Sequence, residues 1–121
     1  MVRNVLDPAI SEYRRWDWKR NQAAERHKVS SKRDIVIEGS GCMSRANREL
    51  ATFGLWIRLD EATRKRRALE RDGAANHQNW DRWAAQEQAF FARERPDLLA
   101  DAIMDGRTGI LVFQADLALP E

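Results

Sequence analysis

The stretch Arg33–Gly41, with the sequence Arg-Asp-Ile-Val-Ile-Glu-Gly-Ser-Gly, constrains the fold more than any other part of the chain. Three β-branched apolar residues in a row, closed by glycine, are typical of a strand that is buried on both faces. Gly39 and Gly41 allow a sharp turn or a close approach to a ligand. The pattern therefore predicts that Glu38 lies at the carboxyl end of a buried strand, where open α/β sheets place their chemistry.

The rest of the chain alternates between strand-like and helix-like segments. Further strands are predicted at 53–59, 100–105 and 110–113, and helices at 7–13, 44–52, 61–71 and 75–93. Three polar residues are placed to cap the first three helices, namely Asp7, Ser44 and Asp60, and Gly73 is placed to end the helix at 61–71. The last two strands are close enough to form an antiparallel hairpin. The alternation itself predicts an α/β fold with a mainly parallel sheet.

Length and composition predict one soluble domain over residues 1–121. No apolar stretch approaches the roughly 20 residues of a membrane span. The single cysteine, Cys42, excludes an internal disulfide and indicates a cytoplasmic location. Residues 1–33 carry nine Lys/Arg against four Asp/Glu, whereas residues 74–121 carry four against eight. This asymmetry indicates either an anionic ligand near the first half or an ordinary solvated surface.

Three arginines share one face of the helix predicted at 61–71, namely Arg64, Arg67 and Arg71. Each guanidinium can bind phosphate through two hydrogen bonds, so the stripe predicts an anion site. Glu70 and Asp72 could instead hold some of these arginines in salt bridges, as on any solvated helix.

Two aromatic residues flank a carboxylate in the basic stretch Tyr13–Arg20, namely Trp16 and Trp18 around Asp17. Stacking rings and a hydrogen-bond acceptor suit a planar polar ligand such as a nucleoside, and the same composition suits single-stranded nucleic acid. The alternative is that at least one of these tryptophans belongs to the core.

The helix predicted at 75–93 carries an apolar stripe of Trp80, Trp83, Ala84, Phe90 and Phe91. Glu87 lies on this stripe, and a carboxylate there needs a partner, for which an arginine of the preceding helix is the obvious candidate.

His27, His77 and Cys42 are isolated in the sequence, so no metal site and no nucleophile–base pair is expected.

Taken in order, these motifs resemble the P-loop nucleoside kinase family, especially the bacterial uridine kinase-like proteins. The resemblance covers residues 6–113. Its motifs are Trp16-Asp17-Trp18, the strand Ile35–Gly39, the pattern of Arg64, Arg67, Arg71, Asp72 and Gly73, the helix with Trp80, Trp83, Glu87 and Phe91, and Asp105-Gly106.

This resemblance implies part of a three-layer α/β/α P-loop kinase-like fold. It implies phosphoryl transfer from ATP, with Mg²⁺, to a nucleoside or similar small hydroxyl compound. By the same analogy the arginine stripe belongs to a lid over the phosphates, Trp16 and Asp17 hold the acceptor, and Glu38 is the catalytic residue near metal and phosphates.

One departure from the family is serious, because no Gly-x-x-x-x-Gly-Lys-Ser/Thr occurs in the 121 residues. The nearest cluster, Gly39-Ser40-Gly41, has no lysine. The chain therefore resembles the C-terminal two-thirds of a kinase and is expected to be inactive alone. A missing first strand predicts an exposed sheet edge beside Ile35–Glu38, which would recruit a second copy or a partner chain.

Two other functions remain open from the residues alone. One is a small basic nucleic-acid-binding module, although the kinase interpretation makes nucleic acid a less favoured partner. The other is a non-catalytic subunit that completes its sheet with another chain.

Overall fold

The computed structural model describes residues 1–30, 32–73 and 77–117, which form a mixed α/β structure with two small sheets. These residues divide into two compact units, an N-terminal unit over Met1–Cys42 and a C-terminal unit over Met43–Glu121. The single domain expected from the length stays a prediction, since a compact unit is defined by contacts and not by independent folding. None of the helices in these ranges is long and apolar enough to cross a membrane.

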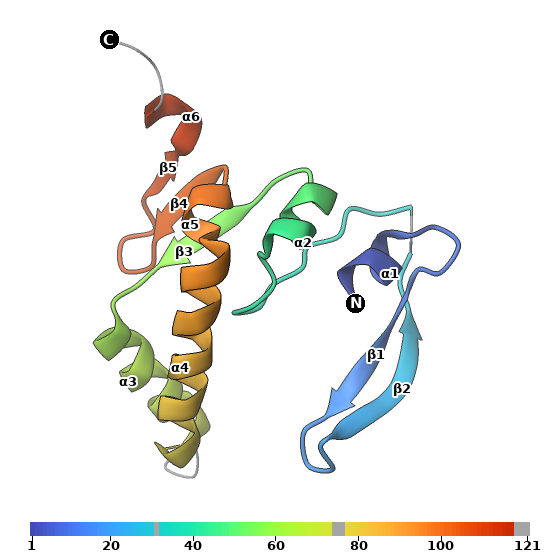
Figure 1. Ribbon diagram of the computed structural model, residues 1–121, viewed down its shortest axis with the longest axis horizontal. Helices are drawn as coiled ribbons and strands as arrows, with labels where there is room; N and C mark the ends of the chain where they lie inside the picture. Colours follow the sequence, from blue (N-terminus) through green and yellow to red (C-terminus); the bar gives the residue numbers. More distant parts are fainter. Residues whose placement is uncertain (31, 74–76, 118–121) are drawn as a thin grey trace. The chain divides into compact units, whose positions relative to one another are not determined.

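The N-terminal unit consists of helix α1 (Val2–Leu6) and an antiparallel hairpin of β1 (Glu12–Asp17) and β2 (Gln22–Lys28) (Figure 1). The helix predicted at 7–13 is wrong, because α1 ends before Asp7. The Asp7 carboxylate instead accepts a hydrogen bond from the Ala9 amide at 2.9 Å.

The hairpin was not predicted, because β2 contains no β-branched residue that would mark it as a strand. Cross-strand contacts hold it together instead. The rings of Tyr13 and His27 stack with centroids 5.4 Å apart, and Arg15 pairs with Glu25 at 2.6 Å.

The strand predicted within Arg33–Gly41 is also wrong. Residues 34–38 adopt neither helix nor strand, Val36 is 91% exposed, and Glu38 is exposed as well. A strand needs a neighbour for its N–H and C=O groups, and no strand in the described ranges pairs with this segment. The free sheet edge predicted beside Ile35–Glu38 is therefore absent from these residues. The turn at the glycines is confirmed, since Gly39 has φ +152° and accepts a hydrogen bond from the Cys42 amide.

The C-terminal unit follows the predicted order of elements closely. It contains α2 (Arg45–Leu50), β3 (Leu55–Arg58), α3 (Glu61–Asp72), α4 (His77–Glu94), α5 (Pro96–Leu99), β4 (Ala102–Asp105), β5 (Leu111–Phe113) and α6 (Gln114–Leu117). The predicted caps at Ser44 and Asp60 are confirmed, because each side chain accepts a backbone hydrogen bond from the residue three positions on. Gly73 ends α3 with φ +77°.

The three strands of this unit form a sheet in the order β3-β4-β5. β3 and β4 are parallel, whereas β4 and β5 form the predicted antiparallel hairpin. With one parallel and one antiparallel pairing, the sheet is mixed rather than mainly parallel. The chain passes from β3 to β4 through α3, α4 and α5, which is the crossover expected for a parallel pair.

Helix α4 packs on one face of this sheet (Figure 1). The ring of Trp56 on β3 lies 5.9 Å from that of Phe91 on α4. Trp80 and Ala84 of the predicted apolar stripe are buried, as is Ala102 on β4. Trp83, on the same stripe, is exposed, so the stripe is not buried along its whole length.

Arg48 on α2 donates hydrogen bonds to residues that precede β4, and one of these residues also accepts a bond from the residue before β3. Its guanidinium donates to the Leu99 carbonyl at 3.0 Å and to the Asp101 carboxylate at 2.6 Å. The same carboxylate accepts the Gly54 amide at 2.7 Å, and a Cβ on Gly54 would lie 3.0 Å from the Arg48 side chain. A larger residue in place of Gly54 would therefore require the Arg48 side chain to shift.

Candidate functional site

At the carboxyl ends of the parallel strands β3 and β4, charged side chains from two neighbouring loops meet. Asp60 follows β3 and caps α3, while Arg107 follows β4. A guanidinium nitrogen of Arg107, Nη2, donates to Asp60 Oδ1 at 2.5 Å and to the Thr63 hydroxyl at 3.3 Å. Strand ends of this kind are where open α/β sheets place their ligands.

The Asp60 carboxylate is held in its ionised form. Its two oxygens accept hydrogen bonds from the amide and the hydroxyl of Thr63, both at 2.9 Å. These bonds, with the smaller contribution of Arg107, lower the pKa of Asp60 to about 2. Asp60 is therefore charged at neutral pH and fully engaged in structure.

Asp105 organises the turn between β4 and β5. Its Oδ1 accepts the amides of Arg107 at 2.7 Å and of Thr108 at 3.3 Å. Gly106 donates its own amide to the Arg58 carbonyl at 2.8 Å, and a Cβ there would lie 3.1 Å from that oxygen. The Asp105-Gly106 motif is thus required by the turn, whatever else it does.

The three arginines of the predicted anion stripe on α3 have different surroundings. Arg64 forms an ion pair with Glu87 on α4, which confirms the predicted partner of that carboxylate. Arg71 binds the neighbouring Asp72 through two hydrogen bonds, at 2.8 Å and 2.7 Å. This contact raises the pKa of Arg71 and lowers that of Asp72. The alternative of a salt bridge to Glu70 or Asp72 is therefore confirmed for Arg71, which binds Asp72, while Arg64 is held by Glu87 instead.

Arg67 differs from the other two. It is exposed, and it forms no ion pair with any carboxylate in the described part of the chain. Its guanidinium donates a hydrogen bond at 3.4 Å to the carbonyl of Gly106, just after β4. Arg67 thus presents a guanidinium at the strand ends, and no carboxylate among the described residues pairs with it.

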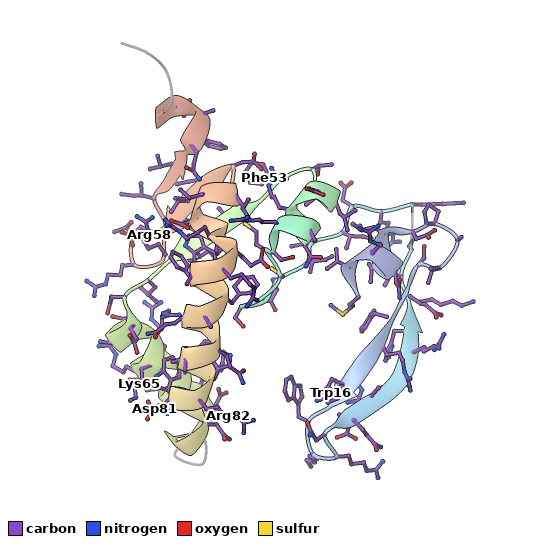
Figure 2. All side chains as sticks on the ribbon, in the orientation of Figure 1. Trp16, Phe53, Arg58, Lys65, Asp81 and Arg82 are labelled. Carbon is purple, nitrogen blue, oxygen red and sulfur yellow. The ribbon has the colours of Figure 1, made fainter. Side chains whose placement is uncertain are left out.

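A second charged contact joins α3 to α4, between Lys65 and Asp81 at 3.7 Å (Figure 2). Arg66 lies 3.9 Å from Glu70 on the same helix. These pairs are exposed, so they add little to stability but lower the number of free cations on α3.

The predicted acceptor residues lie on the hairpin of the N-terminal unit. Asp17 Oδ1 accepts the amides of Lys19 at 3.0 Å and of Arg20 at 3.1 Å, so one carboxylate oxygen is committed to the turn. Trp16 projects from β1 with its side chain exposed (Figure 2). Trp18 is 85% exposed. Because Trp16 is exposed as well, the alternative that at least one of these tryptophans belongs to the core is wrong.

The structure does not bring all predicted site residues into one unit. Glu38, Trp16 and Asp17 belong to the N-terminal unit, whereas the three arginines belong to the C-terminal unit. Within the residues described, no three His, Cys, Asp or Glu side chains are grouped as a metal site. ATP and Mg²⁺ stay predictions that follow from the resemblance.

The contact between Asp60, Thr63 and Arg107 was missed at the sequence level. Asp60 was identified as a helix cap, but 47 positions separate it from Arg107. The one sequence signal for this contact was the prediction of a mainly parallel sheet. Residues that follow two neighbouring parallel strands lie at the same edge of the sheet.

Comparison of this chain with protein-family models, with curated proteins and with solved structures finds no match.

Proposed function

We propose that this chain is part of a uridine kinase-like phosphotransferase, in which it binds the phosphates of ATP through Arg67. In this proposal the chain contributes to a three-layer P-loop kinase-like fold. The reaction is Mg²⁺-assisted phosphoryl transfer to a nucleoside or similar small hydroxyl compound. Because the 121 residues contain no Gly-x-x-x-x-Gly-Lys-Ser/Thr, the chain alone is not expected to carry out the transfer.

The observation that carries the proposal is the position of Arg67. It lies on the arginine-rich helix that the resemblance assigns to the phosphates. It also contacts Gly106, part of the Asp-Gly motif at the end of β4, while Arg64 and Arg71 are held by carboxylates. A guanidinium without a carboxylate partner is the group on this helix best able to bind an incoming phosphate. A cytoplasmic location is part of the same proposal, in keeping with the lone Cys42.

Calorimetric titration of the chain with Mg²⁺–ATP tests this proposal. Arg67→Ala should weaken binding about tenfold to a hundredfold, since it removes a hydrogen bond to a charged group. Arg66→Ala is the matched control, because Arg66 is the adjacent exposed arginine and already lies near Glu70. It should leave the affinity unchanged. Equal affinities for all three proteins would contradict the proposal.

A second candidate function, binding of single-stranded nucleic acid, is favoured by the exposure of Trp18. This ring lies in the hairpin turn next to Lys19 and Arg20, so a base could stack on it while the cations contact phosphates.

A gel-shift titration with a single-stranded oligonucleotide at two salt concentrations tests this candidate. Binding should fall steeply with salt. Trp18→Ala should weaken it about tenfold or more by loss of stacking, whereas Trp18→Phe keeps an aromatic face and most of the affinity. No binding at low salt, which the kinase proposal expects, would exclude this candidate.

A further inference from the structure

The outer edge of β3 pairs with none of the strands that the structure describes, since β3 stands at one end of the order β3-β4-β5. The carbonyls of Gly54 and Arg58 accept hydrogen bonds from β4 and its flanking residues. Backbone groups alternate between the two sides of a strand, so the N–H and C=O groups of Leu55 and Ile57 point to the outer edge. Unsatisfied groups of this kind are a template for another strand.

The sheet face beside this edge is apolar, and four of its side chains are exposed, while Ala102 is buried. Trp56 faces α4, so its neighbours Leu55 and Ile57 face the other way. The register places Ile57, Met104 and Leu111 in one row across that face, and Leu55, Ala102 and Phe113 in the next. Ile57 is 57% exposed, and Leu55, Leu111 and Phe113 are exposed as well. An apolar face of this kind next to a free edge is typical of an interaction surface.

We propose that two copies of this chain associate through β3, pairing antiparallel about a two-fold axis to form one continuous sheet of six strands. Trp56 lies on the axis, opposite Trp56 of the second copy, so Leu55 lies opposite Ile57 of the second copy. Since the groups of both residues point outward, these opposed residues exchange the hydrogen bonds of an antiparallel ladder. The pairing thereby satisfies every outward backbone group of Leu55 and Ile57.

A second copy fits this edge because β3 is complementary to itself. In this register apolar Leu55 meets apolar Ile57 on the exposed face, and Arg58 lies opposite Gly54. No like charges therefore face each other across the pair. Edge strands of monomeric proteins are guarded by charged side chains, Pro or a bulge. β3 has no Lys and no Pro, and its one charged residue, Arg58, stands at its end. The register within the β3–β4 pair is regular as well.

The other edge, β5, supplies a matched control. Leu111 lies in the same cross-strand row as Ile57 and on the same face, at the opposite end of the sheet. Asp105 donates to the Ile110 carbonyl, so alternation points the Leu111 amide away from β4, as it does for Ile57. Ile57→Pro and Leu111→Pro therefore remove equivalent outward amides at the two edges without removing a hydrogen bond to β4.

Sedimentation equilibrium of the whole chain under reducing conditions tests the proposal, with circular dichroism to confirm folding. The unchanged chain should dimerise, Ile57→Pro should weaken the dimer about tenfold or more through two lost hydrogen bonds, and Leu111→Pro should not. If either proline variant fails to fold, Ile57→Lys and Leu111→Lys replace the pair, with the same expected contrast.

Each other outcome would overturn the proposal. A monomer at all concentrations would show that the β3 edge recruits no second copy. Equal weakening by both variants would indicate that exposed sheet faces stack instead. Weakening by the Leu111 variant alone would place the interface at β5.

Discussion

Tryptophan has opposite roles in the two units of this protein. In the C-terminal unit Trp80 on α4 is only 6% exposed, and its ring lies 5.0 Å from that of Trp83. Trp18 in the N-terminal hairpin is almost fully exposed. The difference follows from local periodicity. Trp80 belongs to a stripe with helical spacing, and Trp18 belongs to a turn between two polar strands. Aromatic content alone therefore does not indicate a core, and an exposed ring is available for a ligand.

Aspartates show the same contrast. Asp60 caps a helix of 12 residues and also binds Arg107 from the next strand end, so it joins two elements. Asp17 accepts the amides of Lys19 and Arg20, which lie in its own turn. The C-terminal unit is thus held by contacts between distant residues, and the hairpin by local ones.

The largest expected difference between the units is in the cost of losing a tryptophan. Trp80→Ala should lower the free energy of unfolding by about 3–5 kcal/mol, because it removes a buried ring and leaves a cavity. Trp18→Ala should change it by less than about 0.5 kcal/mol, since the ring is exposed. Urea denaturation followed by circular dichroism measures both. Similar losses for the two variants would show that Trp18 is packed in solution.

A smaller effect on stability is expected at low pH, because each unit contains a carboxyl group with a lowered pKa. The pKa values of Asp60 and of Glu25 both lie near 2, below the usual value of a carboxyl group. Depressed carboxyl pKa values give stability that is complete above about pH 4 and is lost as the pH falls through 2. Asp60→Asn keeps an acceptor at the helix cap, so its unfolding midpoint should depend less on pH in this range than that of the unchanged chain.

Salt should change the pKa values of these two carboxyl groups by different amounts. The low pKa of Glu25 depends first on exposed Arg15, whereas that of Asp60 depends first on Thr63, which is buried. Molar salt should therefore raise the pKa of Glu25 more than that of Asp60, as followed by carboxyl ¹³C chemical shifts. Equal shifts would contradict the roles assigned to Arg15 and Thr63.

The C-terminal unit was largely predictable from the sequence because its signals are local. Ser44, Asp60 and Gly73 mark helix ends through hydrogen bonds or φ values that depend on a few neighbouring residues. The ion pair between Arg64 and Glu87 was predictable for another reason, because a carboxylate on an apolar stripe needs a partner.

The N-terminal unit was not predictable in the same way. Ile35–Ile37 has the composition of a buried strand, but a strand forms only against a neighbour, and pairing is not encoded in three residues. β2 shows the reverse, since its polar sequence becomes a strand through pairing with β1. The candidate site was predictable only in part. The arginine stripe was visible, but which arginine lacks a carboxylate depends on contacts from α4 and the β4–β5 turn.

The most direct test of the proposed phosphate site is an NMR titration of the chain with inorganic triphosphate, which has no base to stack. We expect the side-chain Nε–H signal of Arg67 and the amide signal of Gly106 to shift together and saturate. The indole N–H signals of Trp16 and Trp18 should stay in place. Shifts confined to the hairpin, with Arg67 unchanged, would contradict the assignment of the phosphate site to the end of the parallel strands.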